Sequence, residues 1–333
     1  MHQFLKKLIY FSIIGIGLIL TLVLSYLYFD PFKVLRHYNN FSNPFVISNR
    51  DYISTTMFIN NYKKENYNSF IFGSSRTLAF RPNSWVKYLS KNDKPFMFDA
   101  SGESIYGIYT KLKFLDSKKI ELKNVLIIFC RDASFNNSEN HKGHLFIKHP
   151  ATSGESNLKF QFEFFKAYSN QNFLLNFFAY KILGKYKSFM TGYIENRKIT
   201  FDTLTNEITI VDQENEILQH PNEYYIKRKD LFYERKAEKT DSIQRITDKY
   251  IFMLKEINRI LTKNHTNYKV VLSPLYEQIK FNALDMLLLK KEFGGNLYDF
   301  SGKNSFTDDK INYYETSHFR PNIGDSIFKL IYK

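Results

Sequence analysis

The sequence predicts an α/β fold in which helices cover both faces of a parallel sheet, with one N-terminal transmembrane helix and a large insertion. Three observations predict it. Short apolar runs alternate with helical stretches along most of the chain. An uncharged stretch, Leu8–Phe29, stands near the N-terminus. A long segment, roughly residues 134–235, separates the third apolar run from the fourth.

The composition is that of a folded, basic chain. Of its 333 residues, 44% are hydrophobic and 17% aromatic, which excludes an intrinsically disordered protein. The net charge of +14 suits nucleic acid, anionic lipid head groups or an acidic polymer. Because the basic residues are scattered and no nucleic-acid-binding signature is present, we expect no nucleic-acid partner. The single Cys130 excludes an internal disulfide, and its apolar neighbours predict a packed strand residue.

The first part of the chain indicates a membrane anchor. Leu8–Phe29 is longer than the roughly 20 apolar residues that cross a bilayer core, which disfavours the alternative of a buried core helix. It ends in aromatic residues typical of a membrane interface and lacks a small-residue cleavage site. Lys6 and Lys7 favour a cytoplasmic N-terminus, whereas Lys33 and Arg36 weaken that bias. We expect a single-pass protein of the bacterial inner membrane whose soluble domain faces the periplasm or the cell exterior.

The chain divides into an anchor (residues 1–30), a juxtamembrane linker (31–66) with a helix around Ser54–Lys64, and one α/β domain (67–333). Five apolar runs predict buried parallel strands: Ser69–Phe72, Pro95–Phe98, Asn124–Phe129, Tyr268–Leu272 and Asn296–Phe300. The 3.6-residue period predicts helices at Ile105–Leu115, Asp241–Leu261, Leu275–Glu292 and Ile323–Ile331.

The insertion is expected to shape the binding site, because long insertions at the carboxyl edge of a sheet usually do so. It contains an aromatic helical region around Phe160–Tyr186 and a hairpin around Lys198–Leu218. It also contains three clustered histidines without the cysteine or acidic spacing of a zinc site: His141, His144 and His149. We therefore expect a solvated loop there, and no metal and no cofactor.

A serine follows the first strand. This strand runs into Gly73-Ser74-Ser75-Arg76 and then into helix-forming residues. On a strand-to-helix turn, backbone N–H groups and the helix dipole favour a developing anion. The motif lacks the second glycine of a Gly-x-Ser-x-Gly elbow, and an ordinary turn is the alternative.

Polar residues also follow the second and third strands. Gly102 permits a close approach of its N–H to a bound carbonyl, or else the segment is a turn in which Ser104 caps a helix. Arg131 and Asp132 end the third strand, at the edge where open α/β sheets bind ligands. A surface ion pair is the alternative there.

A carboxylate and a histidine stand three residues apart near the C-terminus. Glu315 and His318 are expected on the same face of one helical turn. His318 can then act as base for a serine while Glu315 orients its ring. A lone surface histidine is the alternative.

Together these segments resemble the SGNH hydrolase superfamily over about residues 68–332, apart from the insertion. In that family a serine, a glycine and a polar residue follow strands one to three, and a C-terminal Asp-x-x-His completes the site. Gly73-Ser74-Ser75 is similar to the serine block, Gly102 to the glycine block, and Glu315-Thr316-Ser317-His318 to the last block. The stretch Ser317–Asp325 is especially similar to cell-envelope members: the alginate O-acetylation proteins and the protein that transfers D-alanine to teichoic acid. Several of these also carry one N-terminal membrane helix.

The sequence departs from the family pattern at two places. The third block usually supplies an asparagine to the oxyanion hole, whereas here it is Phe129-Cys130-Arg131-Asp132. Either Arg131 replaces that donor or Asp132 holds a structural place. Glu315 stands where the family has aspartate, one methylene shorter, and Asp308 and Asp309 are nearby substitutes.

The resemblance implies a three-layer flavodoxin-like sheet and an O-acyltransferase or esterase acting on a cell-envelope polysaccharide. Ser75 would attack an ester carbonyl, His318 would carry its proton and Glu315 would fix the imidazole. Gly102, Arg131 and Asp132 would serve the oxyanion or the substrate. A membrane-bound O-acyltransferase partner and an acidic or neutral envelope glycan are also implied. The alternative, supported by the missing asparagine, is a non-catalytic scaffold or binding protein of an envelope polysaccharide modification complex.

Overall fold

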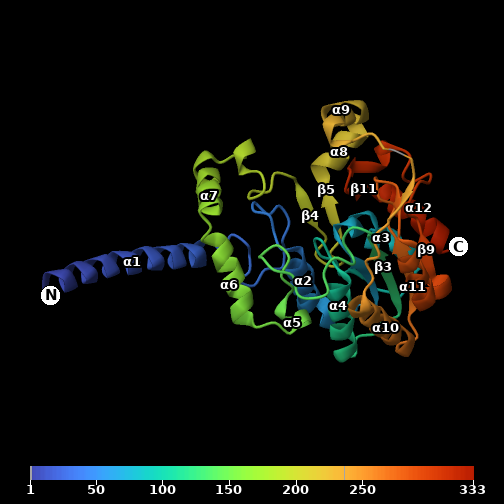
Figure 1. The fold of residues 1–333 in the computed structure, drawn as a ribbon, viewed down its shortest axis with the longest axis horizontal. Helices are drawn as coiled ribbons and strands as arrows, with labels where there is room; N and C mark the ends of the chain where they lie inside the picture. The colour runs from blue at the N-terminus through green and yellow to red at the C-terminus, as the bar shows by residue number, and fades with distance from the viewer. Residues whose placement is uncertain (1, 236) are drawn as a thin grey trace.

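A five-stranded parallel sheet forms the centre of the computed structural model, which describes residues 2–235 and 237–333 (Figure 1). Its strands are β1 (Ser69–Gly73), β2 (Pro95–Met97), β3 (Asn124–Phe129), β7 (Asn267–Leu272) and β9 (Leu297–Asp299). They are ordered β2-β1-β3-β7-β9, with parallel neighbours. In a sheet of this order, ligands bind outside the carboxyl ends of β1 and β3, where the winding reverses. The five expected strands are confirmed.

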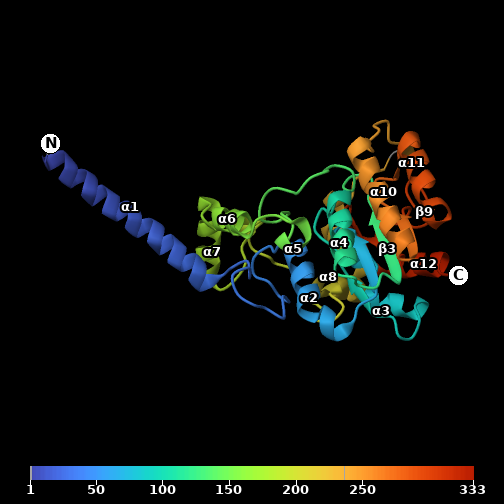
Figure 2. The same cartoon turned by 90° about the horizontal axis from the view of Figure 1, so that it is seen from below.

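Helices cover both faces of the sheet, which makes three layers (Figure 1, Figure 2). One face packs against α2 (Arg50–Glu65), α4 (Ile105–Ser117), α10 (Asp248–Lys263) and α11 (Ala283–Phe293), and the other against α3 (Pro82–Trp85) and α12 (Pro321–Ile331). Strand side chains alternate between the two cores: Phe70 and Phe72 of β1 enter the first, and Ile71 enters the second. Burial on both faces explains why the strands are apolar throughout.

Two of the predicted helices begin later than expected. The helices expected at residues 241–261 and 275–292 begin at Asp248 and Ala283. The residues before them form two short strands that pair in parallel, β6 (Lys239–Thr240) and β8 (Ile279–Lys280). The strand β8 therefore takes the place of a turn of the second expected helix, whereas residues 241–247, which follow β6, form a loop before the first.

The insertion contributes helices and a hairpin of its own. Its elements are α5 (Pro150–Ser153), α6 (Asn157–Tyr168), α7 (Gln171–Leu183), β4 (Ile199–Phe201), β5 (Ile208–Ile210), α8 (Val211–Gln219) and α9 (Pro221–Lys227). The expected aromatic region is two helices, because Asn170 caps the second by accepting a hydrogen bond from the Phe173 N–H (3.2 Å). The expected hairpin is confirmed at β4 and β5, but the residues after β5 are helical.

The three histidines of the insertion are half-buried, so the expectation of a solvated loop is wrong. His141 lies 3.1 Å from the Ser104 hydroxyl, and the His144 ring packs 5.1 Å from that of Phe32. Burial lowers the pKa of His141, His144 and His149 to about 4 each. These rings are therefore neutral packing groups at neutral pH.

The N-terminal helix α1 (His2–Phe29) projects from one end of the molecule (Figure 1, Figure 2). Its residues Gln3–Phe29 are long and apolar enough to span a membrane, with a mean hydropathy of 2.5 in their most apolar stretch, none of which is buried. The guanidinium of Arg36 caps the C-terminal end of α1 by donating to the carbonyls of Leu27 (2.8 Å) and Tyr28 (2.9 Å). A side chain beyond the helix thus satisfies carbonyls that the helix leaves unpaired.

The chain between α1 and α2 is folded into the domain. Residues 43–47 run along the insertion, where the Ile47 N–H donates to the Tyr193 carbonyl (3.2 Å). At the start of α2, buried Asp51 forms an ion pair with buried Lys111 of α4 (2.9 Å). The residues that follow the apolar helix are therefore held against the sheet domain.

Candidate functional site

Ser75 lies at the carboxyl edge of the sheet, in the turn after β1. It begins a short 3₁₀ helix, η1 (Ser75–Ala79). Gly73 precedes it with φ +154°, and a Cβ there would lie 2.9 Å from the Ile128 carbonyl oxygen of β3. Glycine is therefore required for β1 to pass so close to β3 just before the serine.

His318 and Glu315 lie on a β-hairpin, so the expected helical turn is wrong. The strands are β10 (Tyr313–Glu315) and β11 (His318–Phe319), and Glu315 is paired with His318 across them. A two-residue turn places residues i and i+3 opposite each other in a hairpin, just as a helical turn brings them together. The spacing is compatible with both structures, and pairing with a second strand decides between them.

The three residues form a continuous relay. Ser75 Oγ lies 2.7 Å from His318 Nε2, and His318 Nδ1 contacts the Glu315 carboxylate. Because an ionised carboxylate can only accept, Nδ1 carries a proton and Nε2 is free to accept the serine proton. Burial raises the pKa of Glu315, but the hydrogen bonds that its carboxylate accepts from His318 and Ser317 outweigh it and hold the pKa below its usual value.

The two nearby aspartates are engaged elsewhere. Asp308 accepts a hydrogen bond from the Gln278 amide (2.9 Å), and Asp309 accepts one from the Ile311 N–H (2.9 Å). Neither is therefore placed to substitute for Glu315, whose own carboxylate also accepts the Ser317 N–H (2.6 Å).

Gly102 has φ +56°, and a Cβ there would touch the Phe146 ring at 3.4 Å. The loop that carries it starts beside the serine turn, because the Ala100 N–H donates to the Gly73 carbonyl (3.2 Å). Among the described residues, no hydrogen bond occupies the N–H of Ser75 or of Gly102. Both N–H groups are therefore without a partner in the described part of the chain, and the cavity beside Ser75 is lined by Ser101 rather than by Gly102.

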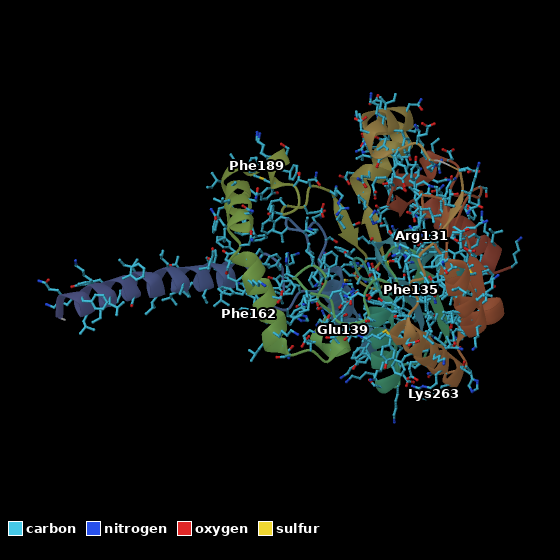
Figure 3. All side chains as sticks on the ribbon, viewed as in Figure 1. Arg131, Phe135, Glu139, Phe162, Phe189 and Lys263 are labelled. Carbon is cyan, nitrogen blue, oxygen red and sulfur yellow. The ribbon has the colours of Figure 1, made fainter. Side chains whose placement is uncertain are left out.

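Arg131 and Asp132 are adjacent in sequence but bind different partners. The guanidinium of Arg131 (labelled in Figure 3) donates to Glu277 (2.7 and 3.0 Å) and contacts Asp241. It is committed to carboxylates on other loops and is not part of the cavity wall at Ser75. Asp132 instead accepts two hydrogen bonds from Arg76 (2.6 and 2.7 Å). Asp132 thus has a structural partner, as one of the two alternatives supposed.

Arg76 is a site residue that the sequence did not single out. It is buried, and besides Asp132 it donates from Nε to the Ser317 carbonyl (2.8 Å). It therefore holds the turn between Glu315 and His318 against the residue that follows Ser75. The available signal was an arginine three residues after the end of β1 and an aspartate three residues after the end of the neighbouring β3.

The first turn of α12 packs directly against η1. A Cβ on Gly324 would lie 1.8 Å from the Ala79 carbonyl oxygen. Arg81, just after η1, also pairs with Asp325 (2.7 Å). Because α12 begins two residues after β11, this close packing sets the position of His318 relative to Ser75.

A cavity of about 120 Å³ opens beside Ser75 and His318. Its wall is mainly apolar, with side chains from α2, η1, the juxtamembrane segment and the hairpin: Ile47, Ile53, Leu78, Ile199, Phe201 and Ile210. The insertion thus lines the cavity at the serine, as expected. Which hairpin residues do so could not be read from the sequence, because they reach the serine only through tertiary packing.

Two arginines in the cavity wall were also missed. Arg50 is buried, and pairs with Asp99 (2.7 Å) while its guanidinium lies 4.8 Å from the centre of the Phe201 ring. Arg197 is half-exposed and pairs with Glu195 (2.8 Å). Arg50 therefore braces the hairpin, and the charge of Arg197 at the cavity is balanced by Glu195, which also lines it.

Within the described ranges 2–235 and 237–333, no group of three His, Cys, Asp or Glu side chains is arranged to hold a metal ion. No protein-family model and no curated protein matches the chain. Its function therefore has to be inferred from the geometry of the site.

Proposed function

We propose that this chain is a serine-dependent O-acyltransferase or esterase that acts on a cell-envelope polysaccharide. In this proposal α1 anchors it in the cytoplasmic membrane and an SGNH-hydrolase-like domain faces the periplasm or the cell exterior. The observation that carries the proposal is the 2.7 Å contact between Ser75 Oγ and His318 Nε2, with Glu315 on the far side of the ring. This is the arrangement that activates a serine.

The chemistry would proceed in two steps. Ser75 Oγ bonds to the carbonyl carbon of an ester donor while its proton passes to His318 Nε2, and the N–H groups of Ser75 and Gly102 hold the oxyanion. The donor's leaving oxygen takes that proton, and an acyl-serine remains. An acceptor hydroxyl, of a glycan or of water, then gives its proton to His318 and takes the acyl group, and Ser75 regains a proton. The acceptor decides between transfer and hydrolysis.

The size and the wall of the cavity favour a short acyl group as the group that is transferred or removed. Its volume of about 120 Å³ and its apolar wall suit a few carbon atoms next to Ser75. The net charge of +14 would keep an acidic polymer near the site, and a neutral glycan would bind without that help. By the family resemblance, a membrane-bound O-acyltransferase partner would deliver the acyl group across the bilayer.

A non-catalytic scaffold is the second candidate function, and the residues that follow β3 favour it. Where the family resemblance calls for an asparagine donor, Arg131 is turned to Glu277 and Asp241. An oxyanion would then have two backbone donors and no side-chain donor from this block. A scaffold needs neither an activated serine nor turnover.

Labelling with a fluorophosphonate probe separates the two. The probe would be applied to the full chain in native membranes and in matched variants. We expect the wild type and Ser74→Ala to be labelled, because the Ser74 hydroxyl is buried beside Cys130 (3.4 Å) and outside the relay. Ser75→Ala and His318→Ala should not be labelled. An unlabelled wild type that is folded and in the membrane would support the scaffold.

A further inference from the structure

Two helices of the insertion expose a row of large apolar side chains. On α6, Leu158 is 83% exposed and Phe162 is 62% exposed, and on α7, Ile182 is 82% exposed. The α6–α7 apolar face comprises five residues of the two helices and, in the short 3₁₀ helix after α7 (Ser188–Met190), Phe189; the five are Leu158, Phe162, Leu175, Phe178 and Ile182. The spacings of i+4 on α6 and i+3, i+7 on α7 put these side chains on one side of each helix. A soluble surface rarely gathers so many, so the face is expected to be covered.

This face adjoins the end of the apolar helix α1. The Tyr26 ring packs against that of Phe165 (5.6 Å), and the Phe29 ring against those of Phe177 (5.3 Å) and Phe178 (5.8 Å). In both views α6 and α7 lie beside the point where α1 enters the domain, and Figure 1 shows them running crosswise to it. Phe162 and Phe189, labelled in Figure 3, lie at the end of the molecule from which α1 projects.

The length of α1 places these helices at the level of the lipid head groups. Its 28 residues extend about 42 Å at 1.5 Å per residue, against about 30 Å for the hydrocarbon core. If α1 spans the bilayer, its C-terminal end therefore emerges at an interface. Helices packed crosswise on that end then lie along the membrane surface.

The charge around the face is positive. Residues 157–194 contain five lysines and one acidic residue, Glu163, and Glu155 just before them pairs with Lys159 (2.8 Å). The lysines are exposed: Lys159, Lys166, Lys181, Lys185 and Lys187. Apolar and aromatic side chains flanked by lysines are typical of helices that lie in the head-group region of anionic membranes.

We propose that the α6–α7 apolar face is a membrane-surface element that inserts into the interfacial region of an anionic bilayer. This inference rests on the proposed anchoring by α1, and not on the chemistry at Ser75. It has a consequence for the site, since the chain that leaves α7 pairs at Tyr193 with Ile47, a residue of the cavity wall. Docking of the face would thereby hold the serine cavity at a set height above the lipid.

The test uses the full chain reconstituted alone into vesicles of phosphatidylcholine and phosphatidylglycerol in equal parts. Single cysteines carrying a fluorescent probe are placed by Phe162→Cys and Ile182→Cys, and brominated acyl chains serve as the quencher. The wild type, whose Cys130 is buried, is the labelling blank. We expect quenching at both positions, and a loss of it in vesicles without phosphatidylglycerol.

Matched controls make the outcome decisive. Leu218→Cys and Ile226→Cys also replace exposed apolar residues (73% and 68%), on α8 and α9, which Figure 1 shows far from α1. They should stay unquenched, whereas Leu18→Cys within α1 should be quenched. If Leu18→Cys is quenched while Phe162→Cys and Ile182→Cys match Leu218→Cys, the proposal is overturned and the anchor stands. That result would indicate that the face binds a protein partner and not the lipid surface. If no variant is quenched, including Leu18→Cys, both the surface docking and the anchoring by α1 are wrong. The catalytic proposal for Ser75 is then still tested separately by fluorophosphonate labelling.

Discussion

Arg76 and Asp132 form a two-pronged ion pair, with Nη1 to Oδ1 at 2.6 Å and Nη2 to Oδ2 at 2.7 Å, that joins the turn after β1 to the end of β3. The third guanidinium nitrogen donates to the Ser317 carbonyl. Burial raises the pKa of Asp132, but the Arg76 contact outweighs it and holds the pKa below its usual value. One side chain thus ties together three segments that are distant in sequence and that carry the candidate site.

Replacing Arg76 by lysine should loosen the relay without unfolding the protein. Lysine keeps the charge but cannot form the fork to Asp132 and also reach the Ser317 carbonyl. We expect the rate of fluorophosphonate labelling to fall by roughly 10–100-fold, as for a displacement of about 1 Å at a catalytic group. Arg259→Lys, at an exposed pair with Glu256, is the control and should label at the wild-type rate. Wild-type labelling of Arg76→Lys would show that the clamp does not position His318.

Loss of either relay residue should abolish glycan esterification in cells. Ser75→Ala and His318→Ala should each remove nearly all activity, and the double variant should lose little more, because the pair acts as a unit. Glu315→Gln should lower the rate by roughly 10²–10⁴-fold, because it no longer holds the imidazole proton on Nδ1. Ester content of the envelope glycan is the measurement, with protein level as the control. Unchanged ester content in Ser75→Ala cells would end the enzyme proposal.

The packing of α12 on η1 should not tolerate a methyl group at Gly324. Gly324→Ala would drive its Cβ into the Ala79 carbonyl, so we expect a loss of about 1–3 kcal/mol in the free energy of unfolding. The labelling rate should also fall, since Ser75 and His318 are held together by this contact. Gly295→Ala is the matched control, because nothing lies within 4 Å of its Cβ. Equal melting temperatures for the two variants would contradict this account.

Acid should destabilise the protein through its half-buried histidines. Burial lowers the pKa of His144 from 6.5 to about 4. Between these values the unfolded chain binds a proton that the folded protein does not, so stability falls as the pH decreases from 6.5 to 4. His144→Phe, with its ring near that of Phe32, should therefore lose roughly 2 kcal/mol less free energy of unfolding between pH 7 and pH 5 than the wild type does. Melting curves at both pH values measure this, and exposed His37→Phe should behave as the wild type. A wild-type pH dependence in His144→Phe would refute the assignment.

The proposed orientation has its own test. A cysteine at exposed Asn136 should react with a membrane-impermeant thiol reagent in intact spheroplasts, since we place the domain outside the cytoplasm. A cysteine at Lys6 should react only after lysis. The reverse pattern would place the domain in the cytoplasm, and cleavage of α1 from the mature protein would remove the anchor.

Local patterns determined much of this protein. The strands are apolar throughout because both faces of a parallel sheet are buried. An uncharged apolar run as long as α1 predicts a helix long enough to cross a bilayer. Ser75 was predicted because it follows a strand at a turn, and His318 because Glu315 stands three residues before it, in a spacing similar to that of a known family. Their approach to 2.7 Å depends on tertiary contacts, namely the packing of α12 on η1 and the hydrogen bond from Arg76 to the Ser317 carbonyl.

Contacts between distant segments decided the rest. The Glu315–His318 spacing fits a helical turn and a hairpin equally, and only the pairing of β10 with β11 selects the hairpin. The sequence also left the roles of Arg131 and Asp132 open, because the choice depends on Glu277 and Arg76, which reach them only after folding. By itself, the sequence determined the layers and the apolar N-terminal helix, from short-range periodicity, and the serine and histidine candidates, from short motifs and their resemblance to a family. The tertiary structure alone decided the clamp at Arg76, the neutral histidines and the cavity wall, because charge pairing and burial depend on neighbours that no local pattern specifies.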